Sequence, residues 1–385
     1  MQAQIQQTVA QYLDEAFALA KDLYEHPELG GQEVRSSAVL CDAFERHGFA
    51  VERSFSGIPT AFRAVRDSGV PGPVIGLCAE YDALPDVGHG CGHNLICTSA
   101  FLAALALAPV LEKTGGRVEV YGTPAEETSG AKVPLTEAGA FDHLSVVMMA
   151  HPAPLAEKSG TSACLLPRQY TFHGKAAHAA ACPQEGVNAL NAVIELFNGI
   201  NAMRQHVPRD VQFHGIVSNG GSAPNVVPDL AQARFYIRAA KLNTARMAVE
   251  RVDHIAQGAA LMTGTTVDME SYEVDYYDLQ TNEALCRAFI AHQQAMGDIL
   301  SPQIHDHGSL DLGNVSHAAP CVHGWFGFGD PTLVPHTLAF AQRTVTEDGR
   351  QLLRRAACTM ALTGYDVLTQ PQLLAEIRRE FEAQS

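Results

Sequence analysis

The chain has 385 residues, of which 46% are hydrophobic and 18% are charged, and its formal net charge is -16 at pH 7. A chain of this length usually divides into two domains, and this composition suits a large buried core rather than a disordered chain. The acidic balance disfavours nucleic acid and anionic membrane surfaces as partners, and it says nothing about the substrate.

Residues 3–24 are expected to form an amphipathic helix rather than a signal peptide, because acidic residues interrupt the apolar ones. An apolar run over 100–111 predicts a buried helix that ends near Pro109, and this run is too short to span a bilayer. The nine cysteines, an odd number without close pairs, favour a reducing compartment over a disulfide scaffold. We therefore expect a cytoplasmic protein with no membrane partner.

Three short, nearly continuous apolar runs follow a second helix, which is expected from Gln32 to His47. They cover 74–79, 118–121 and 144–150. Helical sequence separates the first two runs, and a short helix around 133–139 leads into the third. Runs that are apolar on both faces and alternate with helices predict buried strands of a mixed, largely parallel sheet flanked by helices.

Side chains that can bind a metal follow each of these runs. In chain order they are Glu80, Asp82, His89, Cys91 and His93 after the first run, Glu126 and Glu127 after the second, and His151 after the third. In open α/β sheets, ligands bind in the crevice beyond the carboxyl ends of the strands. The sequence therefore predicts that these side chains gather at one edge of the sheet.

The pattern changes between about residue 166 and residue 274. Strands and helices are expected there in the order βαββαβ, over 169–173, 186–206, 211–218, 230–239, 244–258 and 265–274. This order is typical of a ferredoxin-like sandwich, and its alternating strands differ from the apolar runs before it. We expect a catalytic domain made of residues 1–165 and 278–385, interrupted by an inserted domain over 166–277.

The segment around Cys91 is the first candidate for chemistry. Glycines at 88, 90 and 92 leave room for close approach, and His89 and His93 flank the cysteine. Thiolate and imidazole together are typical ligands of zinc. The simpler alternative is a buried structural cysteine beside an exposed histidine.

Glu126 and Glu127 are the second candidate. Adjacent carboxylates repel each other, so a solvated loop is the simpler interpretation. At the same sheet edge as Cys91, however, neighbouring side chains of an extended chain point in opposite directions. One glutamate can then bind a metal while the other takes a proton from a metal-activated water.

Two further histidines end apolar segments. His151 lies at the end of the third run, where it fits either a ligand or an ordinary loop histidine, and His336 follows the run over 321–329. The candidate ligands are then Cys91, His93, Glu127, His151 and His336, with Glu126 left as the base. Five ligands exceed what one structural zinc site uses, so we expect a centre with two divalent cations.

Five motifs occur in the order in which they occur in a known family. They are Glu80-Tyr81-Asp82-Ala83-Leu84-Pro85, the 89–94 segment, Pro124-Ala125-Glu126-Glu127, Gly174-Lys175-Ala176-Ala177-His178 and Asn225-Val226-Val227-Pro228. The chain resembles the dinuclear zinc peptidases of the aminoacylase and glutamate-carboxypeptidase type, in the branch that includes hippurate, indoleacetyl-amino-acid and aminobenzoyl-glutamate hydrolases. Residues 309–316 resemble a segment of the aminobenzoyl-glutamate-like enzymes, without an assigned role. The likeness runs from His26 to His336.

The resemblance implies a catalytic domain interrupted by a lid domain that also forms a homodimer. It also implies hydrolysis of the amide bond of an N-acyl amino acid or a small dipeptide-like substrate with a free carboxylate. The five candidate ligands match the metal ligands of the family, and Glu126 matches its general base. Many relatives carry aspartate at the position of Asn94, so Cys91 becomes the better candidate for a bridge between the metals.

The same resemblance assigns roles outside the ligand set. Asp82 would orient a ligand imidazole, and His178 would stabilise the oxyanion in the active site of the partner subunit. Asn225 and Arg238 would bind the carbonyl and the carboxylate of the substrate, since a guanidinium binds a carboxylate through two hydrogen bonds. The simpler interpretations are an exposed histidine for His178 and a surface charge on a strand for Arg238.

Two other classes of function compete with the metal hydrolase. An inactive binding or scaffold protein on the same fold would have lost ligands or the base, and a thiol hydrolase using Cys91 would keep its activity after chelation. Serine-hydrolase and nucleotide-binding motifs do not occur in the sequence. A thiolate favours zinc, with manganese or cobalt as alternatives. The aromatic residues Trp325, Phe326 and Phe328 are predicted to be core rather than contacts to an acyl group.

Overall fold

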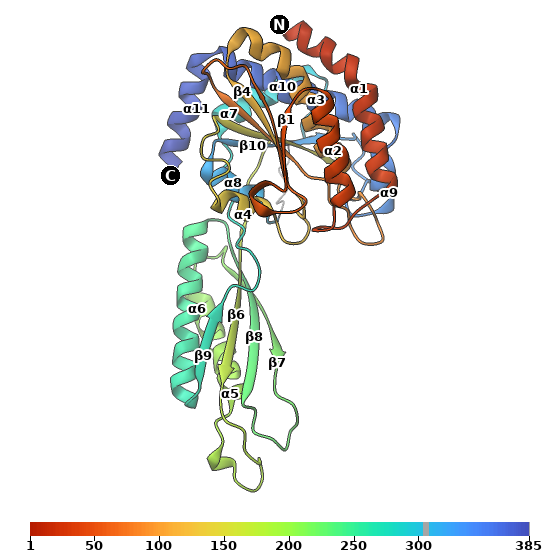
Figure 1. Ribbon diagram of the computed structural model, residues 1–385. Coiled ribbons are helices and arrows are strands. Elements are labelled where there is room, and N and C mark those ends of the chain that lie inside the picture. Colours follow the sequence, from red (N-terminus) through yellow and green to blue (C-terminus); the bar gives the residue numbers. More distant parts are fainter. Residues whose placement is uncertain (303–307, 385) are drawn as a thin grey trace. The chain divides into compact units, whose positions relative to one another are not determined.

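The computed structural model describes residues 1–302 and 308–384 (Figure 1). The chain forms two compact units. Unit 1 comprises Met1–Thr161, Leu279–His307 and Asp311–Ser385, and unit 2 comprises Ser162–Asp278 and Gly308–Leu310. The elements of each unit share their own hydrophobic core.

Unit 1 contains a six-stranded mixed sheet. Its strands lie in the order β1 (Ala50–Arg53), β2 (Phe62–Asp67), β4 (Arg117–Gly122), β3 (Val74–Ala79), β5 (Val146–Ala153) and β10 (Cys321–Gly327). β3 pairs in parallel with β4 and β5, and β5 pairs in parallel with β10, so the predicted largely parallel sheet is confirmed. β1 and β2 add antiparallel pairs at one edge. They were not predicted, because they are short and lack a continuous apolar run.

Two hydrophobic clusters lie on opposite faces of this sheet. Ile75 and Leu77 of β3 belong to one cluster and Cys78 belongs to the other, as expected for a strand buried on both faces. The helices of unit 1 are α1 (Gln2–Glu25), α2 (Val34–Arg46), α3 (His93–Thr114), α4 (Lys132–Glu137), α7 (Glu283–Ala295), α8 (Leu312–Ala318), α9 (Leu338–Thr344), α10 (Glu347–Thr369) and α11 (Pro371–Gln384), with a short 3₁₀ helix at Phe55–Gly57.

Helix α3 is the central helix of unit 1 and packs against α1, α10 and the parallel strands. The expectation that this helix ends near Pro109 was wrong, because it continues to Thr114 and ends at Gly115. Proline removes one backbone donor, and the helices packed around α3 hold it together there. Among the described residues α3 is the one helix long and apolar enough to cross a membrane, and 89% of its apolar window is buried inside the fold.

Unit 2 is a four-stranded antiparallel sheet with two helices. Its elements are β6 (Cys164–His173), α5 (Ala189–Met203), β7 (Gln212–Asn219), β8 (Leu230–Ala239), α6 (Leu242–Thr263) and β9 (Thr266–Glu270), with short 3₁₀ helices at Pro183–Glu185 and Arg204–His206. The strand order β7-β8-β6-β9 confirms the predicted βαββαβ sandwich. Alternate residues of β8 are buried under the helices.

All nine cysteines are free thiols, and seven of them are buried. Cys41, Cys78 and Cys286 lie in the core of unit 1, as their apolar neighbours predicted. Cys91 is partly exposed. It is therefore set apart from the thiols that only fill space.

Candidate metal centre

The candidate residues of unit 1 gather where the parallel strands end. The 80–93 segment follows β3, the 123–128 loop follows β4, and His336 lies in the loop after β10. His151 lies inside β5, two residues before its last residue. The expected convergence at the carboxyl edge of the sheet is therefore present in the described residues.

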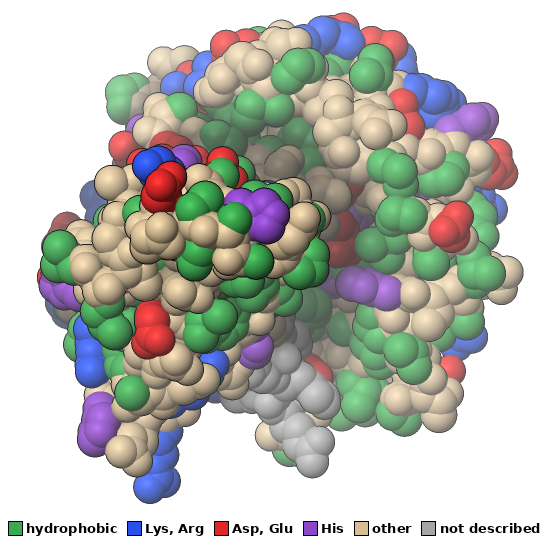
Figure 2. All heavy atoms as spheres, turned by 90° about the horizontal axis from the view of Figure 1, so that it is seen from below, with side chains coloured by type: hydrophobic (Ala, Val, Ile, Leu, Met, Phe, Trp, Pro, Cys, Tyr) green, Lys and Arg blue, Asp and Glu red, His purple; other side chains and the backbone are tan. Residues whose placement is uncertain are grey.

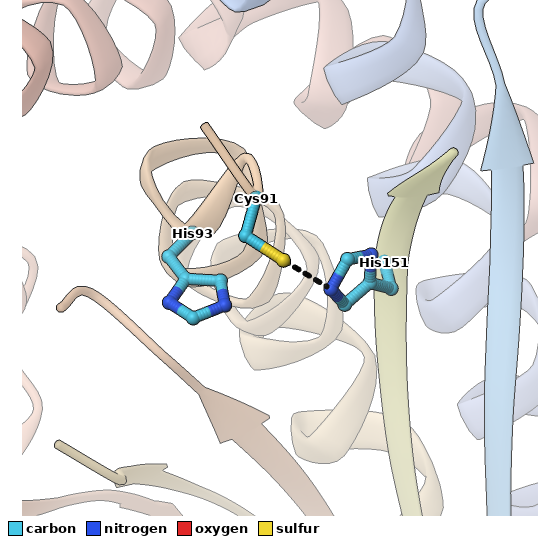
Figure 3. A group of neighbouring side chains, drawn as sticks. All are labelled: Cys91, His93 and His151. Atoms are coloured by element: carbon cyan, nitrogen blue, oxygen red, sulfur yellow. Dashed lines mark hydrogen bonds between the residues drawn. The ribbon is translucent and has the colours of Figure 1, made fainter. Parts of the chain in front are cut away.

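Cys91 is the point where two groups of possible ligands meet. Its Sγ lies 3.6 Å from Nε2 of His151 and 3.4 Å from Nε2 of His336. Cys91, His93 and His151 form one group whose ligand atoms lie within 4.8 Å of one another, and Cys91, Glu127 and His336 form a second such group. Figure 3 shows the first group, with the thiol directed at the His151 ring and His93 beside it. All five ligands proposed from the sequence are brought together.

The His93 ring is held from behind. Its Nδ1 lies 2.9 Å from Asp82 Oδ1, and the other oxygen of Asp82 accepts a hydrogen bond of 3.0 Å from the backbone N–H of Glu127. Nε2 of His93 is left buried without a hydrogen-bond partner among the described residues, as is Oε1 of Glu127. Buried polar atoms without partners, next to a thiol and further imidazoles, fit a divalent cation.

Glu126 and Glu127 lie in a turn rather than in extended chain. The turn begins at Ala125, which has a φ of 61° and whose N–H donates to Glu33 Oε1 at 2.7 Å. The expectation that the two side chains point in opposite directions was wrong, because the turn places ligand atoms of both within 4.8 Å of His93. Glu127 also belongs to the group with Cys91, whereas Glu126 also belongs to a group with Glu80 and Asp311.

A buried lysine lies behind Glu126. Nζ of Lys132 lies 2.5 Å from Glu80 Oε1 and 2.6 Å from Asp311 Oδ1. Burial first, and then Glu80 and Asp311, raise the pKa of Glu126 well above its ordinary value. The sequence analysis missed Lys132 and Asp311, and the one signal for them was a charged residue at the start of an apolar short helix.

The metal-free cluster holds its protons on imidazole rather than on sulfur. Burial raises the pKa of Cys91, but His151 and the hydrogen bonds from the histidines outweigh it and lower that pKa to about 6. The pKa of His336 rises to about 10 through its hydrogen bonds with Cys91 and Glu127. Burial lowers the pKa of His93, but Asp82 outweighs this effect and raises the pKa well above its usual range. A bound cation would take the place of these protons.

Exposure differs across the cluster. The side chain of His336 is 54% exposed and that of Glu127 is 17% exposed, whereas that of His93 is 1% exposed. Figure 2 shows a similar gradient on the surface, where a histidine faces the solvent beside acidic side chains that lie deeper. One side of the cluster is thus open to a substrate.

Several neighbouring residues turn out to be structural. His89 is buried, its Nε2 lies 3.2 Å from the backbone oxygen of Leu23, and burial lowers its pKa to about 3. The Asn94 side chain donates to Ala20 O and Thr344 Oγ1 away from the cluster. Neither residue belongs to the groups of possible ligands found among the described residues.

The aromatic residues of β10 were predicted to be core. Phe326 is fully buried, and Trp325 is 8% exposed. Trp325 is also paired with His151 across the parallel strands, and its ring lies 4.6 Å from the imidazole, centre to centre. Trp325 is therefore both a core residue and a neighbour of the candidate centre.

The candidate substrate residues lie in unit 2. His178 and Asn225 are exposed, and the backbone oxygen of Asn225 accepts a hydrogen bond from Ala179. Arg238 is partly buried on β8 and donates from Nη1 to Ser309 Oγ at 2.8 Å. Ser309 comes from the segment over 309–316 that had no assigned role in the sequence.

Known proteins resemble both the sequence and the fold. Residues 169–261 match the peptidase dimerisation domain of the M20 family. The Xaa-Arg dipeptidase of Mus musculus is 37% identical over 406 residues, which cover 98% of this chain and 92% of that protein. The chain belongs to the M20 family.

Two further comparisons describe this M20 protein. One chain of the p-aminobenzoyl-glutamate hydrolase of Escherichia coli (strain K12) is 37% identical over 271 residues, covering 65% of this chain and 56% of that one. The crystal structure of a dinuclear metal binding peptidase of the M20 family from Bacillus subtilis shares the fold, with a TM-score of 0.68, 21% identity and coverage of 93% and 99% of the two chains. This M20 protein is a metal-dependent amidohydrolase acting on C–N amide bonds, and not an inactive scaffold.

Proposed function

We propose that this M20 enzyme holds two divalent cations and that Cys91 is shared between them. The observation that carries the proposal is that Cys91 Sγ belongs to both groups of ligand atoms, one with His93 and His151 and one with Glu127 and His336. Two-metal centres hold their cations roughly 3.5–4 Å apart, a spacing that one shared ligand suits. The thiolate favours zinc over manganese or cobalt.

Glu126 acts as the general base in this proposal. The bound cations polarise the scissile carbonyl and make the attacking water acidic. Glu126 takes the proton of that water and delivers it to the nitrogen of the leaving amine. The raised pKa of Glu126, caused by burial and by its acidic neighbours, suits a group that holds the proton between the two steps. Asp82 keeps the His93 ring in place for its cation.

His178 is proposed to stabilise the oxyanion. Its Nδ1 accepts hydrogen bonds from the backbone N–H groups of Ala180 at 3.2 Å and of Ala181 at 3.1 Å. A neutral ring then carries its proton on Nε2. Because the side chain is exposed, this Nε2–H is available to an acyl oxygen.

The proposed substrate is an N-acyl amino acid or a dipeptide with a free carboxylate. Two relatives are named for a dipeptide and for an acylated glutamate. Arg238 would bind the carboxylate, since only one of its N–H groups has a described protein acceptor, Ser309, and a guanidinium has five N–H groups. Asn225 would bind the carbonyl oxygen.

A homodimer through unit 2 is part of the proposal. The matched peptidase dimerisation domain lies in this unit. Strand β7 is an edge strand, and its Ile216 and Val217 are 63% and 48% exposed. An exposed apolar edge strand is a template for pairing with another chain. Sedimentation equilibrium tests the dimer, with Ile216→Lys expected to give a monomer.

We place the enzyme in the cytoplasm. Nine free thiols support this location, because an oxidising compartment would convert accessible thiols to disulfides. Fractionation of the source cells tests it.

Glu126→Gln tests the mechanism. We expect kcat to fall by about 100-fold or more with two metals still bound, because general base catalysis contributes roughly 10²–10⁴-fold. The exposed Glu137→Gln is the matched control. Turnover is measured on a panel of dipeptides and N-acyl amino acids, and metal content by elemental analysis. Full activity of the Glu126→Gln enzyme would remove Glu126 from the mechanism.

A thiol hydrolase is the second candidate, and one observation favours it. The pKa of Cys91 is about 6 with three histidines close by, which is typical of a nucleophilic thiolate. The two candidates respond differently to chelation. We expect removal of metal to abolish activity and added zinc to restore it, whereas a thiol hydrolase would keep its activity without metal.

A further inference from the structure

Lys132 is a fully buried charge in unit 1. It is the first residue of α4, its side chain is 0% exposed, and Asp311 Oδ2 also accepts a hydrogen bond of 3.3 Å from its backbone N–H. Burial of an isolated ammonium is very unfavourable, so a lysine here must be held by acidic partners. Glu80 and Asp311 are those partners, at 2.5 Å and 2.6 Å from Nζ.

The acidic groups around this lysine outnumber it. Glu80, Glu126 and Asp311 offer carboxylate oxygens that lie within 4.8 Å of one another. Like charges at such a distance repel strongly where water is excluded. Lys132 is the cation that touches this group, so the separations within the group depend on it.

Two contacts link the group to the candidate centre. Oε2 of Glu80 lies 3.4 Å from Nε2 of His93, while its Oε1 contacts Lys132. Glu126 shares a second group with His93 and Glu127. Lys132 thus lies one side chain behind the proposed base and the proposed ligands.

Asp311 gives a role to the segment over 309–316. Its two oxygens bind both the side chain and the backbone of Lys132, across 179 residues of sequence. It lies directly before α8, which packs against α4. The segment therefore anchors the lysine from the far side of the acidic group.

We propose that Lys132, anchored by Asp311, is a positioning residue for Glu126: its ammonium holds the flanking carboxylates in place, so that the carboxylate of Glu126 is kept toward the metal cluster. The proposal rests on the proposed role of Glu126 as the general base. Lys132 touches neither substrate nor cation in this role. Its effect should therefore appear in turnover rather than in substrate or metal binding.

Lys132→Met keeps the length of the side chain and removes the charge. We expect kcat to fall by about 100-fold, the scale of a misplaced general base, with KM within roughly threefold and metal content unchanged. The control is Lys113→Met, at an exposed lysine of α3. Lys132→Arg, which keeps the charge, should recover part of the loss.

The double variant Lys132→Met/Asp311→Asn restores the net charge of the group by removing one acid together with the cation. We expect its kcat to exceed that of the single variant Lys132→Met by about tenfold. Thermal unfolding of each variant identifies any that fails to fold, and the double variant and Lys132→Arg then decide the outcome.

Three results would overturn the proposal. They are a Lys132→Met enzyme with wild-type kcat, a Lys132→Met enzyme that has lost its metal, and a folded double variant no more active than the folded single one. The test also separates this inference from the proposed function. If the Glu126→Gln enzyme is inactive while the Lys132→Met enzyme is normal, only the inference fails, whereas an active Glu126→Gln enzyme removes the proposed base itself.

Discussion

The two sides of the candidate centre are built differently. The inner side contains Glu80, Lys132 and Asp311, whose side chains are at most 2% exposed and form a closed set of ion pairs. The outer side contains Cys91 and His336, and the His336 side chain is 54% exposed. The comparison shows that charge balance is fixed by the protein on the inner side and is left to protons, cations and solvent on the outer side.

The difference predicts how each side responds to change. A partner removed from the inner side leaves a buried charge without compensation, which is very unfavourable. A ligand removed from the outer side leaves a polar group that water can reach. We therefore expect stability to depend on the inner side and metal binding to depend on the outer side together with His93.

The largest expected effect is on folding stability. Asp311→Ala should lower the free energy of unfolding by about 3–5 kcal/mol, because Lys132 is then buried with one partner fewer. His336→Ala should change it by no more than about 0.5 kcal/mol, because the side chain is exposed. Urea unfolding of the metal-free proteins measures both values, and equal losses would mean that the two sides do not differ.

A smaller effect is expected on metal affinity from the residue that orients His93. Asp82→Asn should weaken binding by about 10–100-fold, since the contact to Nδ1 fixes the ring for its ligand role. Asp86→Asn, at an exposed residue with a φ of 62° that asparagine tolerates, is the matched control. Competition with a chelating dye gives the dissociation constants. An Asp82→Asn protein with wild-type affinity would contradict the role of Asp82.

The pH dependence of metal binding follows from the protons of the metal-free cluster. At pH 7 the pKa of His336, about 10, and the raised pKa of His93 keep both imidazoles protonated, whereas Cys91, with a pKa of about 6, is largely a thiolate. Binding must release the imidazole protons, so affinity should rise with pH between 6 and 9, by about tenfold per unit for each proton released. Calorimetry in buffers of different ionisation enthalpy counts these protons. Binding without proton release would refute the assignment.

The smallest expected effect is spectroscopic. Trp325 is the single tryptophan of the chain and lies against His151, so its emission should respond when a cation binds that imidazole. Cobalt, which has unfilled d orbitals, should quench more than zinc. Trp325→Phe keeps an aromatic ring beside His151 and should change metal affinity by less than about threefold. An emission spectrum unchanged by metal would mean that His151 is not a ligand.

Much of this site was predictable because local sequence carried it. The apolar runs predicted the parallel strands, and the residues after them predicted which side chains meet at the sheet edge. The glycines around Cys91 and the pair Glu126 and Glu127 were visible as motifs. His336 was placed by its position after a predicted strand.

The rest depended on contacts that no local pattern carries. Lys132 reads as a solvated residue at a helix start, and its partner Asp311 lies 179 residues away. The turn at Ala125 requires a positive φ that alanine rarely adopts, so extended chain was the natural expectation. His89 and Asn94 belong to the same motif as Cys91 and His93, and only tertiary packing turns their side chains toward Leu23, Ala20 and Thr344.

The shared position of Cys91 has a consequence for the lifetime of the enzyme. A thiolate with a low pKa and partial solvent access is readily oxidised to sulfenic and then to sulfinic acid, and the second step is in general irreversible. Bound cations shield the sulfur from peroxide. Loss of metal under oxidative stress would therefore inactivate both halves of the centre through a single damaged atom, and resupplied zinc would not rescue them.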